Sequence, residues 1–128
     1  MNEKWTFSKR AASFGHAFHG IAHLLRDEPN ARIHLVVSVL VISAAFLLAI
    51  DASGWRWLGV AMAVVWLAEA FNTAIERIAD AAVPEPHPLI AEAKDVAAGG
   101  VLIAAFFAAL IGFSVLGPAL LRTWARLI

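Results

Sequence analysis

Residues 96–121 read VAAGGVLIAAFFAALIGFSVLGPALL and contain no charged side chain. A helix that crosses a membrane needs about 20 mostly apolar residues to cover a hydrocarbon core about 30 Å thick. Two further segments qualify: residues 31–50, which read ARIHLVVSVLVISAAFLLAI, and a segment that is apolar from 55 to 68 and keeps a helical pattern to about 79. The sequence therefore predicts transmembrane helices at about 31–50, 55–79 and 95–118, with Gly117-Pro118 ending or bending the last one.

The composition supports a membrane protein. Of the 128 residues, 61% are hydrophobic and 16% are charged, and the mean hydropathy is +0.75. A small soluble globule needs more polar surface than this, and a disordered chain needs low hydrophobicity and high charge, so both classes are excluded. The length fits a single domain, 1–128. Ten basic and ten acidic residues cancel, so no nucleic-acid partner is expected, and the lack of cysteine excludes a disulfide framework and a thiolate zinc site.

The segment at about 5–26 predicts an amphipathic helix. Its apolar residues recur every three or four positions and line one helical face, while most of its basic residues lie elsewhere. Such a helix suits the membrane surface, and packing on neighbouring helices is an equally good interpretation. The apolar face comprises Phe7, Ala11, Phe14, Phe18, Ile21 and Leu25. The expected fold is thus an all-α membrane protein with three transmembrane helices and an N-terminal amphipathic surface helix.

Basic residues predict the orientation of the chain, because loops on the cytoplasmic side are enriched in Lys and Arg. With three crossings, the N-terminus and the loop between the second and third crossings share one side. Seven basic residues lie on that side, namely Lys4, Lys9, Arg10, Arg26, Arg32, Arg77 and Lys94. The other side has three, Arg56, Arg122 and Arg126. The N-terminus is therefore expected in the cytoplasm.

Polar residues form a stripe at the end of the second crossing. They are spaced three or four apart and so share one helix face: Glu69, Asn72, Thr73, Glu76 and Asp80. A charge inside a membrane costs about 2.5–3.5 kcal/mol on insertion scales and usually has a function. Hydrogen bonding between helices would explain a lone Asn or Thr. Two carboxylates on one face repel each other unless a cation or a proton lies nearby, which indicates a metal site, a proton site or both.

Two more polar clusters map to the same predicted cytoplasmic interface. One lies between the last two crossings and contains Glu85, His87, Glu92, Lys94 and Asp95; the other lies before the first crossing and contains Asp27, Glu28, Asn30, Arg32 and His34. Taken alone, each cluster is explained by the polar residues that loops and helix starts normally contain. Together they supply oxygen ligands for Mg²⁺, a lysine and a helix N-terminus for phosphate, and a carboxylate base, which are the components of phosphoryl transfer. The chain has no glycine-rich Walker loop and no protein-kinase motif, so a soluble-type kinase domain is excluded.

The most specific motif is residues 69–76, EAFNTAIE, followed by Asp80. It resembles the E-x-x-N-[ST]-A-I-E-x-x-x-D signature of the prokaryotic diacylglycerol kinase family. Residues 93–95, AKD, resemble the family's A-K-D motif, and residues 13–21 and 28–34 resemble its surface helix and the start of its first crossing.

The resemblance implies a small integral membrane kinase of the bacterial inner membrane. It implies a homotrimer whose active sites are shared between neighbouring protomers, and transfer of the γ-phosphate of Mg-ATP to the hydroxyl of a lipid in the bilayer. By position, Glu69 is the expected base, Asn72 orders the site, and Glu28 and Glu76 are the expected Mg²⁺ ligands. The expected nucleotide contacts are Lys94, Asp95, Glu85 and His87, with Lys9 and His16 on the surface helix.

The family has branches that act on diacylglycerol and on undecaprenol. Residues 32–35, RIHL, together with Thr73 and residues 87–89, HPL, look more like the undecaprenol branch. Prolines at 84, 86 and 88 make the loop that carries the expected nucleotide contacts unusually rigid.

Two other functions fit the same residues. A small proton-coupled transporter would use Glu69 as a proton site and would move its substrate without ATP. A non-catalytic assembly factor would use the polar stripe only to specify oligomerisation, and it would bind no nucleotide.

Overall fold

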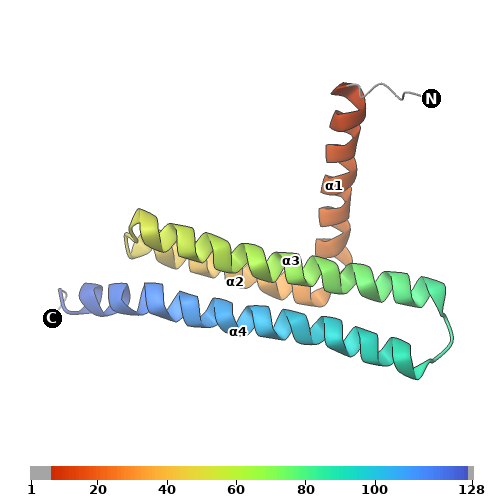
Figure 1. Cartoon of the computed structure of the whole chain (residues 1–128). Helices are drawn as coiled ribbons and strands as arrows, with labels where there is room; N and C mark the ends of the chain where they lie inside the picture. Colours follow the sequence, from red (N-terminus) through yellow and green to blue (C-terminus); the bar gives the residue numbers. More distant parts are fainter. Residues whose placement is uncertain (1–6, 127–128) are drawn as a thin grey trace.

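The computed structural model describes residues 7–126, and the side chains from residue 12 onward. It contains four helices: α1 (Phe7–Asp27), α2 (Pro29–Leu47), α3 (Ala52–Ala82) and α4 (Pro88–Trp124). The described part of the chain has no strand. Helices α2, α3 and α4 run side by side as a bundle, and α1 stands crosswise to them (Figure 1). The predicted all-α fold is confirmed.

Helices α2, α3 and α4 are each long and apolar enough to cross a membrane. Their 19, 31 and 37 residues correspond to about 28, 46 and 55 Å at 1.5 Å per residue. Because the hydrocarbon core is about 30 Å thick, α3 and α4 extend beyond it. The α3–α4 hairpin projects past the corner between α1 and α2 (Figure 1).

Helix α4 is longer than the predicted crossing at both ends. It begins at Pro88, where the His87 ring nitrogen Nδ1 accepts the Leu89 N–H at 3.3 Å, and proline suits the first helical position. The predicted crossing starts at about 95, whereas the helix begins at Pro88, so Lys94 and Asp95 lie about two turns inside the helix. At the other end the helix continues through Pro118 to Trp124. Membrane helices tolerate an internal proline because neighbouring groups satisfy the freed backbone.

Helix α3 is the centre of the bundle, since it carries most of the buried residues. As far as Thr73 these recur at helical spacing along one face, and Ala79 lies further along the helix: Gly54, Leu58, Ala61, Val65, Glu69, Asn72, Thr73 and Ala79. Large apolar side chains on the outer helices are exposed, for example Leu47 at 84% and Phe113 at 78%. Of the polar stripe of α3, Glu69, Asn72 and Thr73 are buried in the bundle, Glu76 is half-buried and Asp80 is exposed.

Helix α1 does not pack its apolar face on the bundle. Phe14 and Phe18 are each 68% exposed and Ile21 is 52% exposed, whereas Leu24 at the end nearest the bundle is buried. A helix that lies across the bundle axis with an uncovered apolar face suits the plane of the membrane surface. The chain turns from α1 into α2 at Glu28, whose N–H still donates to the Leu24 carbonyl at 3.1 Å.

The turn after α2 places Ala49 in the left-handed region, with φ of 49°. The Ile50 N–H donates to the Ala45 carbonyl at 3.1 Å and the Ala49 N–H to the Phe46 carbonyl at 3.2 Å, which is the Schellman pattern of helix ends. Glycine normally occupies this position, because a Cβ there costs roughly 1–2 kcal/mol.

We expect Ala49→Gly to stabilise the fold by about 1 kcal/mol, since it removes this backbone strain. The matched control is Ala63→Gly in the exposed middle of α3, which should destabilise by about 1 kcal/mol because glycine is a poor helix former. Denaturant titration of the purified variants in detergent micelles measures both changes. Equal destabilisation by the two substitutions would contradict the assignment of strain to Ala49.

Candidate active site

Glu69 is the most deeply buried charged residue among the described side chains, with 1% of its surface exposed. Its Oε2 atom has no hydrogen-bond partner in the described part of the chain. The His34 Nε2 atom of α2 lies 3.9 Å from Oε2, which is beyond hydrogen-bond distance. The His34 ring meets the Trp66 ring edge-on, with centroids 6.5 Å apart. A buried carboxylate oxygen without a donor is costly, so it indicates a place where a ligand group completes the hydrogen bonding.

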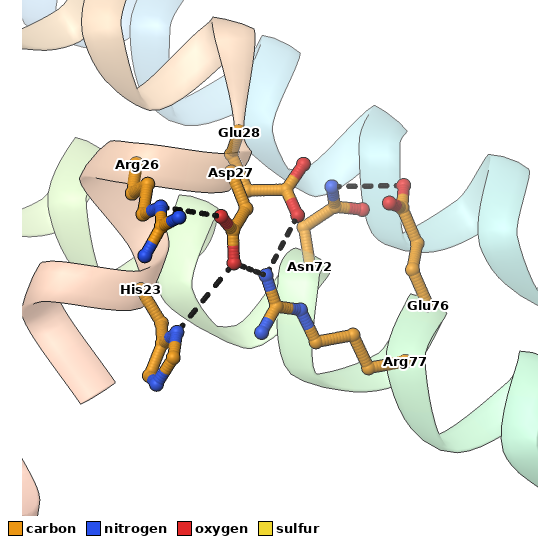
Figure 2. Close-up of polar contacts among 7 residues, drawn as sticks. All are labelled: His23, Arg26, Asp27, Glu28, Asn72, Glu76 and Arg77. Carbon is orange, nitrogen blue, oxygen red and sulfur yellow. Dashed lines mark hydrogen bonds and ion pairs between the residues drawn. The ribbon is translucent and has the colours of Figure 1, made fainter. Parts of the chain in front are cut away.

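The next turns of α3 carry Asn72, Thr73 and Glu76. The Asn72 side-chain N–H donates to Glu76 Oε1 at 3.1 Å (Figure 2). The Asn72 Oδ1 and Thr73 Oγ1 atoms are buried and have no partner among the described residues. Three neighbouring buried oxygens thus lack donors on one helix face, a pattern that fits a cation or a hydrogen-bonding ligand between α3 and its neighbours.

Glu28 reaches this face from the corner between α1 and α2. One Arg77 guanidinium nitrogen, Nη2, donates to Asp27 Oδ2 at 3.2 Å and to Glu28 Oε1 at 3.3 Å (Figure 2). Arg77 thereby ties the corner to α3 and holds the Glu28 carboxylate on the side of α3 that carries Asn72. His23 and Arg26 of α1 also approach Asp27, at 3.6 Å and 4.0 Å.

Three carboxylates converge at this end of the bundle, and we call Glu28, Glu69 and Glu76 the carboxylate cluster. Glu28 and Glu76 both lie close enough to Glu69 to repel its charge. Among the described residues no group of three or more His, Cys, Asp or Glu side chains could hold a metal ion by itself. A metal ion at the carboxylate cluster would therefore need further ligands from a bound substrate.

A second polar region lies at the tip of the α3–α4 hairpin. The Lys94 ammonium donates to Asp80 Oδ1 at 2.8 Å, which joins the start of α4 to the end of α3. A cavity of about 480 Å³ opens beside this pair and is lined by the loop residues Glu85 and His87 as well as by Asp80 and Lys94. We call this cavity the hairpin pocket.

The structure brings most of the predicted site residues into these two regions. Glu28, Glu69, Asn72 and Glu76 meet around the carboxylate cluster, and Glu85, His87 and Lys94 line the hairpin pocket. Asp95 is exposed and does not line the hairpin pocket. His16 is exposed on α1, which leads away from the bundle (Figure 1), and the Lys9 side chain lies outside the described residues.

Four residues to which the sequence assigned no individual role contact or approach the candidate site residues. His34 faces Glu69, Arg77 and Asp27 secure Glu28, and Asp80 binds Lys94. The available signals were the position of Arg77 directly after Glu76 and the four-residue step from Glu76 to Asp80. Neither signal identifies a partner on another helix, because the Arg77–Asp27 contact joins residues 50 positions apart.

Comparison with known proteins shows the family of the chain. The sequence profile of prokaryotic diacylglycerol kinases matches residues 15–116. The chain is 39% identical to the diacylglycerol kinase of Synechocystis sp. (strain ATCC 27184 / PCC 6803 / Kazusa) over 110 residues, which cover 85% of this chain and 63% of that protein. It is 33% identical to the undecaprenol kinase of Bacillus subtilis (strain 168) over 108 residues, which cover 84% of this chain and 88% of that protein.

The chain belongs to the prokaryotic diacylglycerol kinase family, as the motifs at 69–80 and 93–95 predicted. It spans less than two thirds of the length of the Synechocystis relative and most of the length of the Bacillus relative.

Proposed function

We propose that the protein is an integral membrane lipid kinase that transfers the γ-phosphate of ATP to the hydroxyl group of a lipid alcohol. The observation that carries the proposal is Glu69, a buried carboxylate with an unpartnered oxygen beside two further carboxylates. Its place near the water-exposed end of a bundle suited to the membrane lets a water-soluble donor meet a water-insoluble acceptor. The kinase names of both relatives support this activity over that of a transporter.

In the proposed reaction, Glu69 accepts the proton of the acceptor hydroxyl. The acceptor oxygen forms a bond to the γ-phosphorus, the bond between that phosphorus and the bridging oxygen of ADP breaks, and ADP leaves with the electron pair. General-base catalysis needs the base within hydrogen-bond reach of the proton that it removes. The free Oε2 atom of Glu69 meets that need, because no described protein donor competes for it.

The carboxylate cluster suits a magnesium ion that also binds substrate phosphates. Mg²⁺ prefers oxygen ligands and is commonly bound by one or two carboxylates together with substrate phosphates, so a closed protein cage is not required. Glu28 and Glu76 would hold the ion, and Asn72 orients Glu76 through its 3.1 Å hydrogen bond. When bound, the ion neutralises charge on the phosphates.

We assign the nucleotide to the hairpin pocket and the space between it and the carboxylate cluster. Lys94 provides a positive charge there, and Glu85 and His87 provide polar groups from the rigid loop. We also propose Asp95, Lys9 and His16 as nucleotide contacts that contribute less to binding than Lys94. His16 and Asp95 lie outside both regions of their own chain, so in the proposed homotrimer they would contact nucleotide only at the site of a neighbouring protomer.

We further infer that the protein lies in the bacterial inner membrane with its N-terminus in the cytoplasm. The end of the bundle formed by the α1–α2 corner and the hairpin carries Arg26, Arg32, Arg77 and Lys94. The opposite end carries fewer basic residues, and cytoplasmic segments are richer in Lys and Arg. This orientation places the carboxylate cluster where cytoplasmic ATP can reach it.

The test is a phosphorylation assay with purified protein in mixed micelles, radiolabelled ATP and Mg²⁺, with diacylglycerol and undecaprenol offered separately. We expect label in a lipid product, and more label in undecaprenol because the 32–35 and 87–89 segments look more like that branch. Omission of Mg²⁺ should stop the reaction. Failure to label either lipid would overturn the kinase assignment, and proton-coupled flux without ATP would establish the transporter instead.

A further inference from the structure

Arg77 joins the α1–α2 corner to α3, and the proposed reaction above gives it no role. Its Nη2 atom is the donor in both contacts, to Asp27 Oδ2 at 3.2 Å and to Glu28 Oε1 at 3.3 Å (Figure 2). Successive residues of a helix point about 100° apart, so Arg77 faces this corner while its neighbour Glu76 accepts the Asn72 N–H. The guanidinium group therefore reaches the carboxylate cluster from outside, through Glu28.

The backbone of Glu28 is held in place, but it does not fix the direction of the side chain. The Glu28 N–H donates to the Leu24 carbonyl at 3.1 Å, and the Glu28 carbonyl accepts the Arg32 N–H at 3.4 Å. The carboxylate makes no capping hydrogen bond to α2. The contact with Arg77 is thus what directs this carboxylate toward α3. Because the contact uses Oε1, it leaves Oε2 of Glu28 to a cation.

Asp27 restrains Arg77 in turn. The two side chains are 42% and 47% exposed, and a long side chain with that much exposure has many rotamers unless a second partner restricts it. Helix α1 leads away from the bundle (Figure 1), and among its described side chains only Leu24 is buried. The ion pair between Asp27 and Arg77 therefore links the end of α1 to α3 at the level of Glu28.

We propose that Arg77 and Asp27 are positioning residues for the cation site, in which Arg77 orients Glu28 as a ligand and Asp27 anchors Arg77. The inference rests on the proposed function, since it concerns a magnesium ligand of that reaction. A hydrogen-bond partner of a metal-binding carboxylate typically contributes about 10- to 100-fold to metal affinity. Both residues act through Glu28, and neither contacts the reacting atoms.

Charge alone predicts the opposite effect for Arg77. A guanidinium group beside Glu28 repels any cation that this carboxylate binds, so its removal would strengthen cation binding if charge were its whole role. Removal of the Asp27 carboxylate would weaken cation binding for the same reason. Positioning predicts weaker binding in both cases. The sign of the change in Arg77→Ala therefore distinguishes the two roles.

The test measures Mn²⁺ binding by electron paramagnetic resonance, with purified protein in micelles and a non-hydrolysable ATP analogue. Mn²⁺ takes the same carboxylate and water ligands as Mg²⁺. We expect Arg77→Ala to raise the Kd for Mn²⁺ about tenfold and Asp27→Ala to raise it about threefold. The double variant should lie within about twofold of Arg77→Ala, because residues that act through one contact are not additive.

Two further variants separate positioning from charge. Arg77→Lys should keep the Kd for Mn²⁺ within about threefold, because one nitrogen makes both contacts and an ammonium group has three donors. Arg26→Ala is the matched control. It removes a positive charge 4.0 Å from Asp27 in the same corner, from a side chain that is 84% exposed and forms no ion pair with α3 among the described residues. Its Kd should change by less than about twofold.

The rate as a function of Mg²⁺ gives an independent readout. In Arg77→Ala the Mg²⁺ concentration for half-maximal rate should rise about tenfold, whereas kcat at saturating Mg²⁺ should stay within about twofold. A large loss of kcat at saturating Mg²⁺ with an unchanged Kd for Mn²⁺ would overturn the positioning role.

The outcomes separate this inference from the kinase assignment. Tighter Mn²⁺ binding by Arg77→Ala, or an unchanged Kd in an active variant, would overturn the inference and leave the kinase intact. If Arg77→Ala does not fold, Asp27→Ala decides, and an unchanged Kd in that variant would overturn the anchoring of Arg77. Failure of the unmodified protein to bind Mn²⁺ with the analogue would overturn the proposed cation site, and this inference with it.

Discussion

Glu69→Gln is expected to slow lipid phosphorylation by roughly 100- to 10,000-fold, the usual contribution of a general base. The amide keeps the size and polarity of the side chain and cannot accept the proton. Nucleotide affinity should change little, because Glu69 lies deeper in the bundle than the hairpin pocket. The measurements are the initial rate of phosphate incorporation and binding of a non-hydrolysable ATP analogue to the same preparation.

The fold should tolerate this change. A neutral amide costs less to bury than a carboxylate, so the variant should unfold in detergent no earlier than the unmodified protein. Glu92→Gln is the matched control, because it removes a carboxylate from an exposed position of α4 that does not line the hairpin pocket. A folded Glu69→Gln variant that retains more than about a tenth of the activity would disprove the base assignment.

Glu76→Gln has the second largest expected effect, a rise of about 10- to 100-fold in the Mg²⁺ concentration needed for half-maximal rate. The glutamine oxygen can still accept the Asn72 N–H, so the local hydrogen bond survives while the charge is lost. The change therefore isolates the role of the negative charge in binding the cation.

The measurement is the rate as a function of Mg²⁺ at fixed ATP. At saturating Mg²⁺ much of the rate should return, which distinguishes Glu76 from Glu69, whose loss no concentration of Mg²⁺ restores. Glu92→Gln again serves as the control. An unchanged Mg²⁺ dependence in Glu76→Gln would remove Glu76 from the proposed ligand set.

Hydropathy and periodicity were sufficient to predict the helices, because a membrane span and an amphipathic face are local patterns. They did not predict where α4 begins. The alternating prolines indicated an extended loop, and the last of them, Pro88, is instead the first residue of the helix. The sequence also did not predict that α4 continues past Pro118, because neighbouring groups decide whether a proline ends a helix in a membrane.

The helix period predicted that four candidate site residues share one face of α3, namely Glu69, Asn72, Thr73 and Glu76. Contacts between helices were not predictable from spacing, because they depend on how the helices pack. The Arg77–Asp27 pair and the approach of His34 to Glu69 are of this kind. Asp95 belongs to a specific motif, yet its position in the site was not predictable. Helix α4 begins about two turns before it, and its side chain is exposed and does not line the hairpin pocket.

Glu28 occupies the N-cap position of α2, with φ of −102° and ψ of 115°, and its side chain makes no capping hydrogen bond. Serine, threonine, aspartate or asparagine at an N-cap typically contributes about 1 kcal/mol to helix stability. A redesign guided only by thermostability would therefore choose serine here and discard a carboxylate of the proposed cation site. At this corner the chain therefore has the acidic side chain of Glu28 in place of a residue that would cap α2.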